Sequence, residues 1–124
     1  MPLTHTISQS FSQPGIAGLG GTIIRTGTAE ANISAPLAAA TTDNLQTVSL
    51  TVAQMLSLFL LSDVALTIEA NSASVPTFTI TLAAGAPLIW TSGNGTNPFT
   101  ADVTALYLTC TLAANFEMRC LYNS

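Results

Sequence analysis

Residues 51–62 read TVAQMLSLFLLS, a dense apolar run in a chain of 124 residues that has almost no charge. A membrane-spanning helix needs about 20 consecutive apolar residues. This run extends only from Val52 to Leu61, and Gln54 and Ser57 interrupt it. A membrane span is therefore excluded, and the choice lies between a buried strand and a helix.

The spacing inside the run favours a helix. Apolar residues at i, i+3, i+4 and i+7 form the stripe of an amphipathic helix. In this run they are Val52, Met55, Leu56 and Phe59. Thr51 and Gln54 have the spacing of a capping box, in which two side chains satisfy free amides at the helix start. We therefore expect one short α-helix near 52–61, covered on more than one side.

The rest of the chain alternates apolar and polar residues with period two, the pattern of strands with one buried face. The clearest segments are 106–112 and 116–122, which are separated by Ala113–Asn115 and are predicted to pair as a hairpin. In total the pattern predicts about eight strands, at 3–11, 22–33, 45–50, 64–70, 78–82, 88–90, 106–112 and 116–122. The predicted fold is all-β, a two-sheet, jelly-roll-like β-sandwich with one short helix.

The domain organisation is expected to be simple. Residues 1–21 are an N-terminal arm or a first strand, and GIAGLGG at 15–21 is interpreted as a flexible turn or hinge. Residues 22–124 are expected to form a single β-sandwich domain. The N-terminal MPLTHTISQSF has neither the basic segment nor the apolar core of a signal peptide.

The chain carries very little positive charge. It has no lysine, its two arginines are Arg25 and Arg119, and its formal net charge is −4. Nucleic-acid binding depends on neutralising phosphates with Lys and Arg, and binding to a membrane surface needs a basic amphipathic face. Neither partner is therefore expected. So neutral a surface favours a subunit of a larger assembly, because soluble monomers usually carry more surface charge.

The two cysteines, Cys110 and Cys120, fall on predicted apolar faces. We expect buried free thiols, although a disulfide would form if the two residues lay directly opposite each other. Two cysteines and one distant histidine, His5, do not supply the closely spaced ligands of a zinc site. No metal ion or cofactor is therefore expected.

No catalytic set is evident, and no catalytic residue is assigned. His5 is the only histidine and no GxSxG nucleophile motif accompanies it, so a solvated or interface histidine is expected. The carboxylates are scattered singly, as Glu30, Asp43, Asp63, Glu69, Asp102 and Glu117. A glycosidase-type pair that meets in space across the sandwich stays open. The chain is predicted not to be an enzyme.

Trp90 and the polar loop 91–98 are the candidate ligand-binding elements. Trp90 shares a face with Leu88, which favours a core position, whereas an exposed ring would be able to stack on a sugar. The sequence leaves open whether Trp90 or this loop binds a ligand.

Three segments together resemble small virion proteins of tailed bacteriophages. They are TVAQMLSLFLLSDVALTIEAN at 51–71, PTFTITLAAGAPLIWTSG at 76–93 and NPFTADVTALYLT at 97–109. In that family a short helix is followed by a strand, then by a strand pair with the pattern "L-aag-pl-W", and then by a "pft-dvt-lyvt" segment. The resemblance covers about residues 46–122. The ending LAANFEMRCLYNS departs from it, with a shorter hairpin.

The resemblance implies a β-sandwich with a structural place in the virion, often as a head decoration or cement protein. Such a protein is made in the host cytoplasm and binds the capsid exterior. Its implied partners are the major capsid protein and copies of itself, as a dimer or trimer. A tail, collar or fibre module that binds a host glycan is the alternative, because the different ending leaves the position in the virion open.

Overall fold

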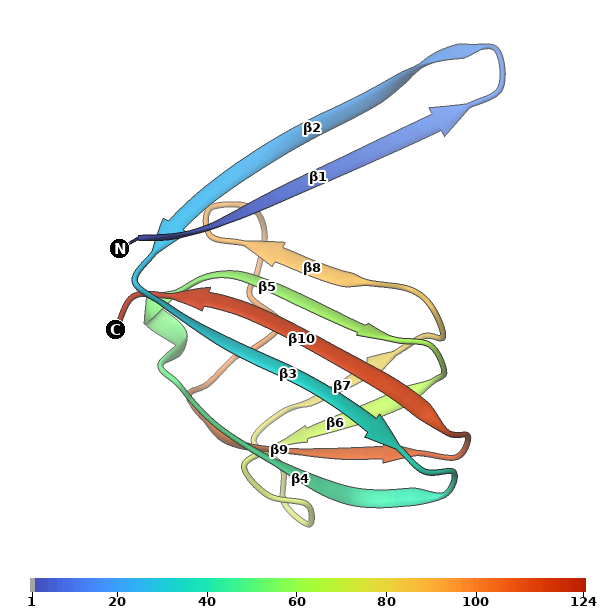
Figure 1. Cartoon of the computed structure of the whole chain (residues 1–124), viewed down its shortest axis with the longest axis vertical. Helices are drawn as coiled ribbons and strands as arrows, with labels where there is room; N and C mark the ends of the chain where they lie inside the picture. The colour runs from blue at the N-terminus through green and yellow to red at the C-terminus, as the bar shows by residue number, and fades with distance from the viewer. Residues whose placement is uncertain (1) are drawn as a thin grey trace.

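The computed structural model describes residues 2–124, which form ten β-strands and one short helical turn (Figure 1). The strands are β1 (Leu3–Gln13), β2 (Ile16–Gly27), β3 (Ala29–Leu37), β4 (Thr41–Leu50), β5 (Met55–Ser62), β6 (Leu66–Ala70), β7 (Thr79–Leu82), β8 (Leu88–Thr91), β9 (Val103–Cys110) and β10 (Ala114–Tyr122). Neighbouring strands are antiparallel throughout. The predicted all-β class is confirmed.

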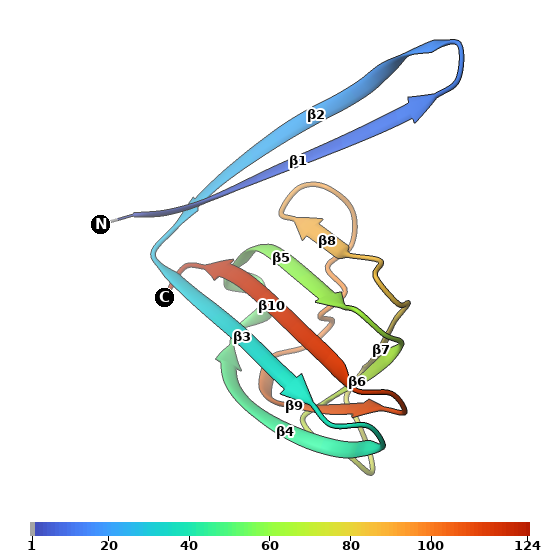
Figure 2. The same cartoon turned by 45° about the vertical axis from the view of Figure 1, so that its right-hand side comes forward.

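Strands β3 to β10 form two four-stranded sheets that pack face to face, the arrangement of a β-sandwich (Figures 1 and 2). The first sheet has the order β3-β10-β5-β8, and the second has the order β4-β9-β6-β7. The chain passes between the sheets at every connection from β3 onward except that between β6 and β7. Strands far apart in the sequence thus become neighbours, and β10 lies between β3 and β5.

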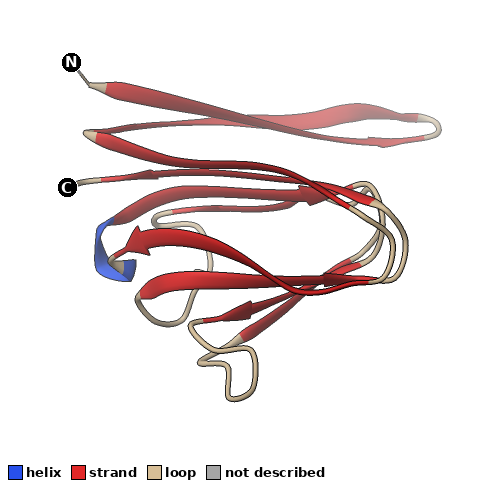
Figure 3. Cartoon of the chain, turned by 60° about the horizontal axis from the view of Figure 1, so that its bottom comes forward, coloured by secondary structure: helices blue, strands red, loops and turns tan. Residues whose placement is uncertain are grey.

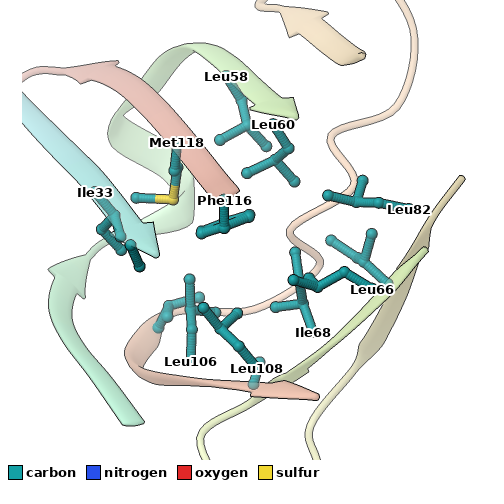
Figure 4. Close-up of a cluster of buried hydrophobic side chains, with 14 of the residues drawn as sticks. Ile33, Leu58, Leu60, Leu66, Ile68, Leu82, Leu106, Leu108, Phe116 and Met118 are labelled. Carbon is teal, nitrogen blue, oxygen red and sulfur yellow. The ribbon is translucent and has the colours of Figure 1, made fainter. Parts of the chain in front are cut away.

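The core lies between the two sheets and is built from alternate residues of each strand (Figure 4). The first sheet contributes Ile33, Leu58, Leu60, Phe116 and Met118, and the second contributes Leu66, Ile68, Leu82, Leu106 and Leu108. Each fully buried side chain of this size stabilises the fold by roughly 1.5–3 kcal/mol. The inward faces predicted for 64–70, 78–82 and 116–122 agree with this core.

The helix predicted near 52–61 is wrong. Within residues 2–124 the single helical segment is a 3₁₀ turn at Val52–Gln54 (Figure 3), and the apolar run that follows it is strand β5. Thr51 makes no side-chain capping bond. Instead, the Gln54 amide donates to the Thr51 carbonyl oxygen at 2.9 Å. The capping-box interpretation therefore fails as well.

Strand β5 is apolar on both sides because both of its faces are covered. Leu58 and Leu60 point into the core, whereas Phe59 is half-buried on the opposite, outer face. Above that outer face lies the separate layer formed by β1 and β2 (Figure 3). A run that is apolar at nearly every position also fits a helical spacing, so periodicity could not separate a helix from a doubly covered strand.

The hairpin predicted between 106–112 and 116–122 is also wrong. Strand β9 belongs to the second sheet and β10 to the first, so the connection between them passes from one sheet to the other. β9 ends at Cys110, and Leu112, the last apolar residue of the strand predicted at 106–112, is 64% exposed. Two strands with matching apolar faces satisfy the same sequence pattern whether they pair side by side or face each other.

The glycine-rich segment 15–21 forms a strand rather than a flexible turn. Gly15, with a φ of 80°, closes the turn after β1, and β2 then begins at Ile16. The strand predicted at 22–33 is divided at Thr28, where β2 gives way to β3. The predicted domain boundary between residues 21 and 22 therefore falls inside β2.

Candidate interaction site

Strands β1 and β2 form a two-stranded sheet of their own, which we name the arm (residues 3–27). The arm lies over the outer face of the first sheet at its base and diverges from the sandwich toward its turn (Figures 1 and 2). Within residues 2–124, the outer edges of β1 and β2 pair with no other strand. An isolated two-stranded sheet is only marginally stable in water, so an arm of this length needs contacts beyond its own ladder.

The two faces of the arm differ in chemistry. Because alternate strand residues point to opposite sides, the cross-strand pairs on the face toward the sandwich are His5–Arg25, Ile7–Ile23 and Phe11–Leu19. The opposite face carries Thr4, Thr6, Ser8, Ser10, Thr22, Ile24 and Thr26. At the far end Phe11 and Leu19 are 63% and 67% exposed, so the apolar face is uncovered there.

His5 joins the base of the arm to two strands of the first sheet. Its Nδ1 lies 2.7 Å from Ser57 Oγ on β5, and its Nε2 lies 3.1 Å from Glu30 Oε1 on β3. Ser57 is buried beneath the arm, with 1% exposure. One imidazole ring thus connects the arm to strands on either side of β10.

Arg25, the cross-strand partner of His5, makes the second polar connection. Its Nε donates to Ser92 Oγ at 3.0 Å, and its Nη2 donates to the Ser92 carbonyl oxygen at 2.6 Å. Ser92 begins the loop that follows β8. The arm and this loop therefore hold each other in place.

The arm ends where β2 passes closely over β10. A Cβ atom on Gly27 would lie 2.8 Å from the Tyr122 carbonyl oxygen and 3.0 Å from side-chain atoms of Leu121 and Leu56. Glycine is therefore required by this close approach. Leu121 is on the opposite side of β10 from the core residue Cys120, yet it is fully buried, because the arm covers it.

A hollow of about 270 Å³ lies between the arm and the first sheet. It is lined by four consecutive residues of β1, Thr4 to Ile7, and by Phe59 and Arg119. Strand β1 therefore forms one wall of this hollow, and the outer face of the first sheet forms the other.

The structure brings together Ser57, His5 and Glu30, the residue types of a nucleophile, a base and an acid. Their wide separation in the sequence gave no sign of this cluster. The serine hydroxyl, however, lies beneath the arm, and a substrate would reach it only if the arm moved away. In this arrangement the three side chains fasten the arm to the sandwich.

Asp63 and Glu117 make separate structural contacts. Asp63 accepts hydrogen bonds from the backbone and side-chain nitrogens of Asn115, at 2.8 and 3.0 Å, and these bonds hold the pKa of Asp63 below its ordinary value. The hydroxyl of Ser34 donates to Glu117 at 2.6 Å, and Arg119 Nη2 lies 2.9 Å from the same carboxylate as an ion pair. The Ser34 bond, with Arg119 adding to it, lowers the pKa of Glu117. These contacts brace the outer face of the first sheet and one of its turns.

Cys110 and Cys120 are free and buried, as predicted. Burial raises the pKa of the Cys120 thiol to about 12. Trp90 packs against the core on the same side of β8 as Leu88, and its indole Nε1 donates to the Gly95 carbonyl oxygen at 3.2 Å. The ring therefore takes the core-facing position that its alternation predicts, and it supports the loop 91–98.

The sequence pattern predicts the first strand of the arm and the second half of β2, but it misses the first half of β2 at 16–21. The signal was the turn dipeptide Pro14-Gly15 between two alternating segments, which is typical of a hairpin. It was obscured by Gly18, Gly20 and Gly21, because glycine is depleted in strands. The contacts of His5 and Arg25 had no sequence signal, since their partners are distant along the chain.

In the part of the chain that the structure describes, no group of three or more His, Cys, Asp or Glu side chains is placed to hold a metal ion. No helix in residues 2–124 has the length and apolar character needed to cross a membrane. Comparison with protein-family models, curated proteins and solved structures gives no match to this chain.

Proposed function

We propose that this chain is a non-enzymatic structural protein of a tailed-bacteriophage virion, which binds the exterior of the assembled capsid and stabilises it as a cement or decoration protein. The observation that carries the proposal is the arm, with its unpaired strand edges and its uncovered apolar end at Phe11 and Leu19. Such edges and patches are stabilised by joining a neighbouring sheet or surface. The arm is therefore suited to contact between subunits.

The strand order supports a jelly roll for the body of the molecule. Eight strands in two sheets, with β3 and β10 adjacent in one and β4 and β9 adjacent in the other, are the pattern of that fold. Jelly rolls are common in viral capsid proteins and in lectins, and a shared fold does not fix a function. The resemblance of residues 46–122 to small phage virion proteins favours the capsid role over the lectin role, although strand β5 stands where that family has a short helix.

The remaining properties suit a protein that works in many copies. The chain has few charges, so its partners, the major capsid protein and copies of itself, do not have to be strongly charged. Individually weak contacts become strong when they are repeated over a lattice, because binding at one site raises the effective concentration at the next. A homo-oligomer with a rigid sandwich and a projecting arm would be able to staple neighbouring capsid subunits.

Phage heads purified without this protein provide the test. Full-length protein is expected to bind these heads and to raise their resistance to heat or to a chelator. A double variant, Phe11→Ser with Leu19→Ser, is expected to fold but to bind weakly, because it lacks the apolar end of the arm. Ile24→Ser is the matched control, since Ile24 is 59% exposed on the opposite face of the arm.

The outcomes separate the parts of the proposal. Heads that are equally robust with and without the protein would rule out the cement role. Equal binding by the double variant and the wild type would rule out the apolar end of the arm as the contact. Binding to purified tails but not to heads would favour the alternative, a tail, collar or fibre module that binds a host glycan, and would direct attention to Trp90 and the loop 91–98.

A further inference from the structure

We infer that two copies of this chain associate through the unpaired edge of β1, so that their arms form one four-stranded antiparallel sheet in the order β2-β1-β1-β2. The inference deepens the self-association contained in the proposed function by naming its interface. It is tested on purified protein alone, so its outcome does not depend on binding to a capsid. Three features of the arm carry it: the sequence of β1, the absence of charge, and the hollow beside β1.

The sequence of β1 is a palindrome of residue types centred on Gln9. Residues 6–12 read Thr-Ile-Ser-Gln-Ser-Phe-Ser, with hydroxyl and apolar residues at matching distances on either side. When two copies pair antiparallel about a twofold axis at Gln9, Ser8 faces the partner's Ser10 and Ile7 faces the partner's Phe11. A twofold interface must be self-complementary. In this register each side chain from Thr6 to Ser12 meets one of its own chemical type, an advantage that an unrelated strand would not have.

The same register extends the apolar face of the arm across both copies. Within one arm, Ile7 pairs with Ile23 and Phe11 pairs with Leu19, all on the face toward the sandwich. In the joint sheet, each row of four apolar side chains crosses all four strands, and one row lies on each side of Gln9. Phe11, which is largely exposed in the single chain, thereby gains Ile7 of the partner as an apolar neighbour.

No charged residue between Thr6 and Ile24 opposes this pairing. From Thr6 to Ile24 the chain contains no Asp, Glu, Lys or Arg. Soluble proteins usually protect an exposed edge strand with charged side chains or with proline, and two identical charged strands would repel each other when antiparallel. Strand β1 has neither protection between Thr6 and Gln13, so its edge is suited to pairing with an identical edge through main-chain hydrogen bonds.

The hollow provides room for a side chain of the second strand. It lies between Thr4–Ile7 of β1 and the outer face of the first sheet, and in this register His5 to Ile7 pair with residues 11–13 of the partner. The partner's Phe11 would then lie near Phe59, which is half-buried on the outer face of β5. Antiparallel pairing also places the two sandwiches at opposite ends of the joint sheet. Each sandwich lies at the base of its own arm and next to the turn of the partner's arm, which at that end has diverged from the partner's sandwich (Figures 1 and 2).

Charge complementation on the full-length protein tests the interface. The wild type is expected to have a mass in solution of twice the chain mass of 12.8 kDa. A variant with Ser8→Lys and Ser10→Lys, or with Ser8→Glu and Ser10→Glu, places two like-charged pairs across the interface. Each is expected to raise the dimer Kd by about tenfold or more. An equimolar mixture of the two variants is expected to restore the dimer, which also shows that both are folded.

Two controls locate the contact on β1. Thr22→Lys with Thr26→Lys adds the same charge to the same face of the arm but on β2, and it is expected to leave the dimer intact. Gln9→Cys places two thiols opposite each other across the twofold axis, so oxidation is expected to give a covalent dimer. Thr22→Cys is its control and is expected to remain monomeric under denaturing conditions, because the native cysteines are buried and Thr22 lies away from the axis.

A wild type that stays monomeric at about 100 μM, which is well above the Kd of ordinary specific complexes, would overturn the inference. So would a dimer that the mixed charge variants fail to restore, or equal cross-linking at positions 9 and 22. A dimer confirmed by these tests but unable to bind phage heads would leave the inference standing and remove the proposed function. A monomer that binds heads would overturn the inference and leave the proposed function standing.

Discussion

His5 on β1 and Ser57 on β5 are 52 positions apart in the sequence, and their Nδ1 and Oγ atoms lie 2.7 Å apart. The serine is buried, so this bond forms where water is largely excluded. With the contacts of Arg25 and Gly27, it is one of a small number of connections between the arm and the sandwich. The orientation of the arm therefore depends on few residues, whereas the sandwich is held by a continuous core.

Ser57→Ala is expected to loosen the arm without disturbing the sandwich. The substitution removes the hydrogen-bond partner of His5 Nδ1, and the loss of one such bond costs about 1 kcal/mol. Hydrogen exchange is expected to become faster for amides of β1 and β2 while those of β9 and β10 keep their protection. Ser8→Ala is the control, because Ser8 contacts Thr22 within the arm. If hydrogen exchange in β1 and β2 became equally faster in both variants, the His5–Ser57 bond would not be what holds the arm to the sandwich.

Gly27→Ala is expected to destabilise the protein by about 1–3 kcal/mol, because the added methyl group overlaps the backbone and side chains of β10 and β5. Gly21→Ala serves as the control, since a Cβ there would meet nothing within 4 Å. Its effect should stay within about 0.5 kcal/mol. Urea unfolding measures both values, and similar midpoints for the two variants would show that β2 does not pass closely over β10.

Leu108→Ala is expected to lower the free energy of unfolding by about 2–5 kcal/mol, because Leu108 is fully buried in the core. Leu112→Ala, four residues further along the chain, is expected to change the free energy of unfolding by less than about 0.5 kcal/mol, since Leu112 lies outside β9 and is exposed. Thermal or urea unfolding of the pair tests where β9 and its buried face end. A large loss of stability at Leu112 would show that the core extends beyond Cys110.

Asp63→Asn is expected to reduce stability near neutral pH. The pKa of Asp63 is lowered in the folded protein by its bonds to Asn115, so the charged carboxylate stabilises the fold above its ordinary pKa near 3.8. That contribution is lost as the pH falls through the lowered pKa. The wild type and the variant should therefore converge in stability in acid. Glu69→Gln, on the second sheet, is the control for removal of a carboxylate charge. A difference in stability between the wild type and Asp63→Asn that persists unchanged to low pH would contradict this linkage.

The two thiols are expected to be unreactive in the native protein. The thiolate is the reactive form, and burial raises the pKa of Cys120 to about 12, while Cys110 is also buried. An alkylating reagent at pH 8 is expected to modify neither residue until a denaturant is added, and then to modify both. Rapid labelling of one thiol in the native state would show that its strand opens locally. Failure to label either residue after unfolding without reductant would indicate a disulfide.

The sequence by itself determined which residues are buried in most strands. Period-two alternation marks one face of a strand as apolar wherever the other face meets solvent, so the inward positions of Ile68, Leu82 and Met118 followed directly. The scarcity of charge likewise followed from composition, and with it the expectation of a covered surface. These properties are local, since they depend on each residue and its near neighbours in the chain.

Tertiary structure decided what each strand packs against. Strand β5 was mistaken for a helix because the arm covers its outer face, which removed the alternation that identifies a strand. The crossing between β9 and β10 was invisible because an apolar face has the same sequence whether its partner lies beside it or across the core. The cluster of His5, Glu30 and Ser57 was equally hidden, since contacts between distant residues leave no spacing in the chain. The sequence carries the preference of a side chain for burial, whereas the identity of its neighbour is fixed only when the whole chain has folded.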